Sequence, residues 1–201
     1  MIGGIVPRPI AWVSTRSADG VDNLAPFSFF AGVGSNPMTL LFCPANRADG
    51  TEKDSLRNAK PRAEGGTGEF VVQIVPVALA REMAASAAEL EPERSEFDLV
   101  GLERAPSVRV SPPRVRRAMV AYECVTEQVI RTNPGAPGGG NIVIGRVVLV
   151  HVADEALGER GHIRPEVLDA VGRMGGTLYC RTRDRFELPS GESALGLPPV
   201  V

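Results

Sequence analysis

The sequence predicts a mainly β fold, either a barrel or a sandwich with a few helical additions. Short apolar and β-branched segments recur along most of the chain, as in strand-rich proteins. The turn signal "ADG" separates the first two of these segments by so few residues that they must be antiparallel neighbours. Helical periodicity is confined to a few short stretches.

We expect eight strands. Residues 119–130 and 141–152 are the two longest candidates, and an antiparallel pair across a Gly/Pro-rich loop suits them. The eight predicted strands are residues 10–15 (IAWVST), 23–30 (NLAPFSFF), 37–43 (PMTLLFC), 69–76 (EFVVQIVP), 119–130 (MVAYECVTEQVI), 141–152 (NIVIGRVVLVHV), 177–182 (TLYCRT) and 185–188 (RFEL).

Residues 23–30 form the least regular of these strands. Pro26 cannot donate to a ladder, and such a residue is confined to edges or bulges. Strict alternation does not place Leu24, Phe27, Phe29 and Phe30 on one face. We therefore expect a bulge near Pro26.

Three helices are expected. In residues 77–90, apolar side chains recur every three or four positions behind Pro76, which predicts one amphipathic helix. A shorter helix is expected in residues 165–173 (PEVLDAVGR). A third is expected to begin near Asp54 and Ser55, both good N-cap residues.

Composition narrows the class of protein. The 201 residues are 43% hydrophobic and 23% charged, with a net charge of −2, which fits one domain over residues 1–201 with a loose or partner-contacting tail at 189–201. Without a long basic block, we expect no nucleic-acid partner. No apolar run has transmembrane length and no signal peptide is evident, so we expect no membrane association.

Cysteine and histidine usage points to a reducing compartment without a metal site. The three cysteines are scattered and odd in number, which favours the cytoplasm over a disulfide scaffold. The two histidines have no ligand spacing to a cysteine, so no metal ligands are assigned. No Ser/His/Asp grouping or carboxylate pair stands out, and no catalytic residue is assigned.

Several polar residues are candidates for ligand binding, each with a plainer interpretation. Lys53, Asp54 and Ser55 suit a phosphate at a helix start, although the triplet alone favours a simple N-cap with a solvated lysine. Ser14 and Thr15 end an apolar strand, where they would contact a ligand or cap a turn. Arg8 is held extended between two prolines, as a surface charge or an anion contact.

Other motifs are better explained without a ligand. The glycines of residues 133–141 lead into a strand rather than a helix, so they indicate a hairpin loop and not a phosphate loop. Arg181, Arg183 and Arg185 alternate along an extended segment, which is typical of a solvated strand face.

Together these motifs resemble the flavin reductase-like family of FMN-binding split barrels. The resemblance runs from about residue 5 to 188, and it rests on the order and spacing of the motifs as much as on each motif alone. The motifs are "RPIAWVST", "DG", "NLAPFSFF", "SNPMTLLF", "KDS", "TGEFVVQIV", "LAREMAASA", "EFDLVGLE", "SPPRV", "YECV", "IVIGRVV" and "VGRMGGTLY".

The resemblance implies a six-stranded antiparallel Greek-key split barrel, a homodimer, and FMN reduced by NAD(P)H, with an oxygenase as a possible recipient of reduced flavin. Ser55 stands where threonine is usual in the family, so the hydroxyl is kept. Trp12 would lie beside the cofactor or in the core. Arg173 and Tyr179 are weaker candidates near the nicotinamide, and Arg8 is a weaker candidate for a cofactor contact. By position, the resemblance assigns FMN contacts to Ser14, Thr15, Asn23, Ala25, Pro26, Phe27, Ser28, Lys53, Asp54 and Ser55.

Three functions remain open at the level of the sequence. The first is an NAD(P)H:flavin oxidoreductase that releases reduced flavin. The second is an FMN protein that keeps its flavin and passes electrons to a partner or to its own substrate. The third is a binding module for another ligand. The sequence does not separate NADH from NADPH, or FMN from FAD as the shuttled flavin, because no donor fingerprint is present.

Overall fold

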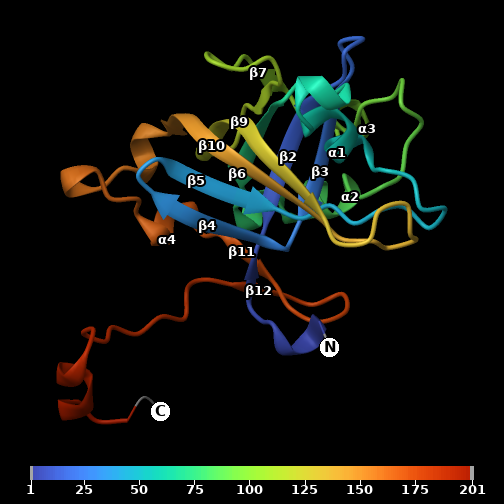
Figure 1. Ribbon diagram of the computed structural model, residues 1–201. Coiled ribbons are helices and arrows are strands. Elements are labelled where there is room, and N and C mark those ends of the chain that lie inside the picture. The colour runs from blue at the N-terminus through green and yellow to red at the C-terminus, as the bar shows by residue number, and fades with distance from the viewer. Residues whose placement is uncertain (1, 200–201) are drawn as a thin grey trace.

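The computed structural model describes residues 2–199, and its centre is a curled antiparallel sheet of seven strands (Figure 1). The strand order is β3-β2-β6-β9-β10-β5-β4. The mainly β split-barrel prediction is confirmed, but this sheet has one strand more than the predicted six. Its strands are β2 (Ala11–Arg16), β3 (Asp22–Phe27), β4 (Phe30–Ser35), β5 (Met38–Phe42), β6 (Glu69–Ile74), β9 (Val120–Arg131) and β10 (Asn141–Val152).

The predicted strand at residues 23–30 is divided between two strands. β3 ends at Phe27, and β4 begins at Phe30 on the opposite edge of the sheet. The pairing of β2 with β3 is regular, with Trp12 opposite Pro26, so the expected bulge near Pro26 is absent. Pro26 is tolerated because β3 is an edge strand, where a missing N–H breaks no ladder.

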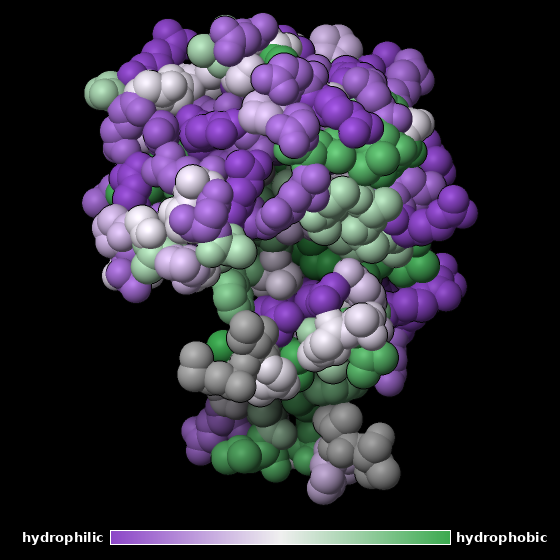
Figure 2. All heavy atoms as spheres, turned by 90° about the vertical axis from the view of Figure 1, so that its right-hand side faces the viewer, coloured by the Kyte–Doolittle hydropathy of each residue, from purple (hydrophilic) through white to green (hydrophobic). Residues whose placement is uncertain are grey.

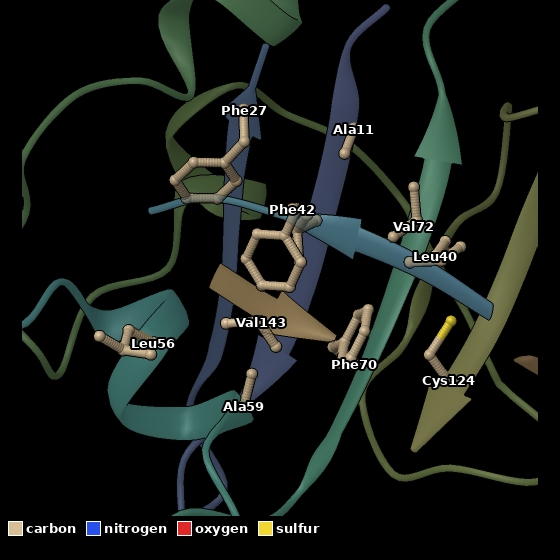
Figure 3. Close-up of a cluster of buried hydrophobic side chains, with 11 residues drawn as sticks. Ala11, Phe27, Leu40, Phe42, Leu56, Ala59, Phe70, Val72, Cys124 and Val143 are labelled. Carbon is tan, nitrogen blue, oxygen red and sulfur yellow. The ribbon is translucent and has the colours of Figure 1, made fainter. Parts of the chain in front are cut away.

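One hydrophobic core fills the inside of the curled sheet (Figure 3). Phe42 lies between Phe27 and Phe70, with ring centroids 5.2 and 5.1 Å away. Helix α1 (Asp54–Ala59) closes this core with Leu56 and Ala59. A Cβ at Gly145 would come within 2.4 Å of the Phe70 ring, so glycine is needed where β10 passes over it. Two register shifts between β9 and β10 bend the strands there.

A second core lies on the other face of β2. Ile10, Trp12 and Leu24 pack there against Leu79, Met83 and Phe97. The covering helices are α2 (Ala80–Ala85) and α3 (Glu96–Leu99). Because β2 has a core on both faces, its residues 11–15 are all buried, which explains why the strand is apolar without alternation.

The helices are shorter than the sequence predicts. In the predicted helix at 77–90, a 3-10 turn precedes α2, which ends at Ala85. In residues 165–173, α4 covers only Pro165–Leu168, and Val171–Arg173 form strand β11. Asp169 between them is left-handed, with φ of 42°, which ends the helix. The 3-10 turns are Ile2–Gly4, Arg62–Glu64, Val77–Leu79, Asp154–Ala156, Glu159–Gly161 and Glu192–Gly196.

Two smaller sheets complete the fold. β1 (Arg8–Pro9), β11 and β12 (Tyr179–Arg181) form one, and β7 (Arg104–Ala105) pairs with β8 (Arg114–Val115) in the other. The β1-β11-β12 sheet joins the N-terminus to a segment far along the chain. The N-terminus and strands β11 and β12 lie below the barrel in Figure 1.

The chain after β12 leaves the barrel as an arm (Figure 1). Residues 185–188, predicted as a strand, have no regular structure, because no neighbouring strand is available to pair with them. The arm exposes Phe186, Leu188, Leu195 and Leu197, and Figure 2 shows hydrophobic surface on this lower part of the molecule. Of the predicted tail at 189–201, residues 200 and 201 lie outside the described residues. None of the described helices has the length and hydrophobicity needed to cross a bilayer.

Candidate functional site

A small pocket beside β3 brings together seven residues predicted from the sequence. It has a volume of about 70 Å³, and we call it the central pocket. The seven residues are Asn23, Ala25, Pro26, Phe27, Lys53, Asp54 and Ser55. Its remaining lining residues are Arg47, Ser86, Ala87, Ala88, Glu89, Leu90 and Glu96.

Hydrogen-bond donors and cations gather at the α1 side of the central pocket. The Asn23 side-chain amide donates to Ser55 Oγ over 3.0 Å, which fixes β3 against α1. Lys53 Nζ lies 3.4 Å from the exposed carboxylate of Glu89, a weak pairing that leaves its charge available to a ligand. Asn23 and Ser55 are buried, so their positions are set by the fold.

Asp54, which also lines the central pocket, is held by two arginines. One carboxylate oxygen accepts a hydrogen bond of 2.5 Å from Arg47, and the other pairs with Arg57. Both oxygens are therefore used by arginines, and Asp54 positions one of them, Arg47, at the pocket wall. Arg47 is a lining residue that sequence reasoning missed.

Glu96 is a second lining residue that the sequence did not reveal. It is 5% exposed, and its Oε2 accepts a hydrogen bond of 2.8 Å from the backbone N–H of Leu24. Burial raises the pKa of the Glu96 carboxyl, partly offset by the hydrogen bond from Leu24. A buried acid with a raised pKa in a pocket is typical of functional sites.

A second, larger pocket continues from the central pocket past Pro26. It has a volume of about 500 Å³, within the range of small-molecule sites, and we call it the arginine pocket. It contains Arg8, Ser28, Arg173 and Tyr179, all predicted from the sequence. Its full lining is Gly3, Arg8, Ile10, Pro26, Ser28, Phe29, Met83, Arg173, Gly175, Gly176 and Tyr179.

Pairing of β1 with β11 places Arg8 opposite Arg173 in the arginine pocket. Arg8 is 6% exposed and donates to Ser28 Oγ and to the carbonyls of Ile5 and Met174. The Arg173 guanidinium stacks on the Tyr179 ring, 4.6 Å from its centroid, and donates to its hydroxyl. Two guanidiniums beside aromatic rings suit a flat, electron-rich ligand.

Trp12, Ser14 and Thr15 do not line either pocket. Trp12 is buried in the second core, and its indole N–H donates to Ser86 Oγ over 2.8 Å. Ser14 Oγ donates to the Pro113 carbonyl, and Thr15 Oγ1 accepts from Asn58. The side chains of these three residues point into the fold, since a core on both faces of β2 leaves them no open side, and their contact with a flavin stays a prediction.

No local signal marks Arg47 or Glu96 as site residues. Arg47 lies in an irregular loop with no periodicity, and it reaches the pocket through its bond to Asp54. Glu96 follows a charged loop and meets Leu24, a residue 72 positions away. The described residues contain no cluster of His, Cys, Asp or Glu suited to a metal ion.

Comparison with known proteins gives the family. The family model described as "Flavin reductase like domain" matches residues 3–186. An uncharacterised protein of Deinococcus radiodurans is 41% identical over 191 residues, covering 92% of this chain and 80% of that protein. The chain therefore has close relatives over nearly its whole length.

Solved structures agree with the sequence comparison. The crystal structure of nitrilotriacetate monooxygenase component B from Bacillus cereus has a TM-score of 0.85 at 37% identity, covering 93% of this chain and 90% of that one. The 2-nitrobenzoate 2-nitroreductase NbaA of Pseudomonas fluorescens has a TM-score of 0.77 at 27% identity, covering 100% and 91%. With split-barrel fold, sequence and motifs in agreement, this chain belongs to the flavin reductase-like domain family.

Proposed function

We propose that the protein is an NAD(P)H:flavin oxidoreductase that holds FMN along β3. The observation that carries this proposal is the junction of the central and arginine pockets at Pro26, with cations at both ends. A flat ring joined to a phosphate is a ligand of matching shape and charge. The whole chain would form one functional domain.

The residues of the central pocket fit the phosphate and side chain of FMN. Lys53 and Arg47 would supply positive charge, and Ser55 and Asn23 would supply hydrogen bonds. Ala25 is small and Pro26 is flat, so both allow a ring to approach the edge of β3. Phe27 and Ser28 would flank the ring, with Phe27 also anchored in the first core.

The arginine pocket would receive the reacting end of the flavin and the nicotinamide. The flavin, when bound, supplies the hydride-accepting chemistry. Arg8, which is buried, would favour the negative charge that reduction adds to the ring system. Arg173 and Tyr179, which hold one another, would orient NAD(P)H. Hydride transfer needs no general base, and we assign none.

We further propose that reduced flavin passes to an oxygenase in the cytoplasm. The similarity to a monooxygenase component B supports an oxygenase partner. All three cysteines are free thiols, which suits a reducing compartment. A homodimer is proposed from the family resemblance, and the exposed apolar residues of the C-terminal arm support it.

A second candidate function is an FMN protein that keeps its flavin. The similarity to the nitroreductase NbaA favours this alternative, in which electrons reach an organic substrate or a protein partner directly. The pockets along β3 would serve both functions equally. The two candidate functions differ in whether free flavin is turned over.

An anaerobic reduction experiment separates the candidates. Purified protein is mixed with NADH or NADPH, with and without excess FMN, and followed at 340 and about 450 nm. Turnover of added FMN is expected for the oxidoreductase. Bleaching of bound flavin alone would favour the second candidate, and the absence of any flavin binding would refute both.

A further inference from the structure

The Gly/Pro-rich segment between β9 and β10 packs against the segment that carries Arg47. We call residues 132–140 the hairpin loop and residues 44–51 the Arg47 loop, and Figure 1 shows the two side by side. An isolated antiparallel bridge joins Ala45 to Gly140. Because Arg47 lines the central pocket, the hairpin loop supports a segment that reaches the candidate site.

Two buried asparagines fasten the two loops together. Asn141 is 2% exposed, and its side-chain amide donates to Asn46 Oδ1 over 2.8 Å and to the Pro44 carbonyl over 2.9 Å. The side-chain amide of Asn46 donates to the Ala136 carbonyl over 3.0 Å, and its backbone N–H donates to the Gly139 carbonyl over 2.9 Å. Since buried polar groups are costly to leave unpaired, these bonds fix the position of one loop relative to the other.

The Arg47 loop is also tightly folded on itself. The Arg47 N–H donates to the Thr51 carbonyl over 2.8 Å, and the Arg47 carbonyl accepts from the Gly50 N–H over 3.0 Å. Gly50 has φ of 85°, and a Cβ there would overlap the Gly135 carbonyl, so only glycine lets the hairpin loop lie this close. With its backbone held on both sides, Arg47 enters the pocket with little freedom beyond that of its own side chain.

The chain just after the Arg47 loop is tied to the same hairpin. Glu52 accepts hydrogen bonds from Arg131, the last residue of β9, over 3.2 Å and from Lys60 over 2.8 Å. Although burial opposes its ionisation, these two cations hold the pKa of Glu52 below its usual value. The hairpin therefore holds the backbone on either side of Arg47, while Asp54 holds its guanidinium.

We propose that Asn141 is a positioning residue for the flavin phosphate, acting through Asn46 on Arg47. The proposal rests on the proposed function, because it takes Arg47 as one of the cations that meet the FMN phosphate. A guanidinium binds phosphate best when its planar group is already oriented, since each freedom lost on binding lowers the affinity. The hairpin loop would thus raise FMN affinity from behind the central pocket, although its residues are not among those that line it.

The variant Asn141→Ala tests the proposal, with FMN and riboflavin titrated by quenching of flavin fluorescence. We expect FMN affinity to fall about tenfold and riboflavin affinity to change by less than about twofold, because only the phosphate meets Arg47. In protein that already carries Arg47→Ala, the same change should leave the ratio of FMN to riboflavin affinity unaltered. Asn133→Ala, which removes an exposed asparagine from the hairpin loop, is the matched control and should behave as wild type.

A second measurement uses wild-type protein and does not depend on the folding of a variant. If the fastened loops favour phosphate binding, then bound phosphate must in turn favour the fastened loops, because the coupling is reciprocal. Saturating FMN should therefore slow amide hydrogen exchange at Asn46 and Gly139 by at least about threefold relative to saturating riboflavin.

The outcomes separate this inference from the proposed function. Equal losses for FMN and riboflavin in Asn141→Ala, or equal protection of the loops by the two ligands, would mean that Asn141 only stabilises the fold. If Arg47→Ala lowers FMN affinity and Asn141→Ala does not, the positioning role is overturned and the flavin function stands. If wild-type protein does not prefer FMN to riboflavin, the phosphate placement itself is wrong and the inference fails with it.

Discussion

Two buried glutamates, Glu123 on β9 and Glu96 at the start of α3, show how differently one residue type is used in this fold. Glu123 accepts hydrogen bonds from the amides of Val108 and Arg109 and from His151. Although burial opposes its ionisation, these donors hold the pKa of Glu123 below its usual value. For Glu96, burial outweighs its hydrogen bond from Leu24 and the pKa is raised.

The difference in pKa direction distinguishes a glutamate that stabilises the fold, Glu123, from one that lines the candidate site, Glu96. Glu123 and Glu69 together hold the 108–111 loop, since Ser111 donates to Glu69 through both its N–H and its hydroxyl. A carboxylate with complete hydrogen bonding stabilises structure. Glu96 lines the central pocket, and burial rather than hydrogen bonding dominates its ionisation, which is the condition expected of a group that meets a ligand.

The largest effect on stability is expected for Glu123→Gln. The amide cannot accept from all three donors, so the variant should lose about 3 kcal/mol of unfolding free energy. Because the folded pKa of Glu123 is lowered, its contribution is present above the unfolded pKa and is lost as pH falls through the folded pKa. Urea unfolding at several pH values measures the loss of unfolding free energy and its dependence on pH. Glu127→Gln, exposed on the same strand, is the control, and equal losses in the two variants would contradict the distinction.

The largest effect on the site is expected for Lys53→Ala combined with Ser55→Ala. FMN affinity should fall about 100-fold, or about 2.7 kcal/mol, because a cation and a hydrogen-bond donor are removed from the phosphate. Fluorescence titration measures the change. Arg117→Ala combined with Ser193→Ala removes the same groups from exposed positions and should leave the affinity unaltered.

A smaller effect is expected for Arg173→Ala in the arginine pocket. The KM for NAD(P)H should rise about tenfold while the FMN dissociation constant stays within about twofold, because Arg173 lies at the far end from the phosphate residues. Steady-state kinetics with saturating FMN measure the KM. Arg183→Ala, an exposed arginine outside the pocket, is the control, and a change in FMN affinity alone would reverse the assignment.

The smallest effect is expected for Glu96→Gln, and it should be favourable. Removing a negative charge from the central pocket should tighten FMN binding by about threefold to fivefold at pH 7. A raised folded pKa means that the stability linked to Glu96 is full below its unfolded pKa and is lost as pH rises through the folded pKa. The unfolding free energy of the variant should therefore equal that of wild type at acidic pH and be slightly higher at neutral pH. Unfolding curves at pH 4 and 7 measure this, with Glu103→Gln as the control. If Glu96 were a purely structural acceptor, the variant would be less stable than wild type at pH 7.

The parts of the fold that sequence reasoning predicted are those governed by local patterns. Period, turn residues and strand length located β2, β5, β6, β9 and β10. β4 was missed because its "FAGVGS" carries small, exposed residues and because the preceding apolar run hides the break at Ser28. β11 was mistaken for helix because Val171 and Gly172 follow a true helical turn, and only the left-handed Asp169 ends it.

The same division holds for the candidate site. Lys53, Asp54 and Ser55 are contiguous, and Asn23 to Phe27 form one strand, so short motifs mark them. Arg47 and Glu96 enter through contacts between distant segments, which no single window of sequence contains. For Trp12 and Ser14 the sequence left both a ligand contact and a structural role open, because a strand buried on both faces has no alternation to tell one side from the other.

The most direct test of the account compares FMN with riboflavin, which lacks the phosphate. Both ligands are titrated into wild-type protein and into the variant with Lys53→Ala and Ser55→Ala. We predict that wild type binds FMN about 100-fold more tightly than riboflavin and that the ratio falls close to one in the variant. Equal ratios in the two proteins would mean that the phosphate lies elsewhere, and would contradict the placement of the flavin along β3.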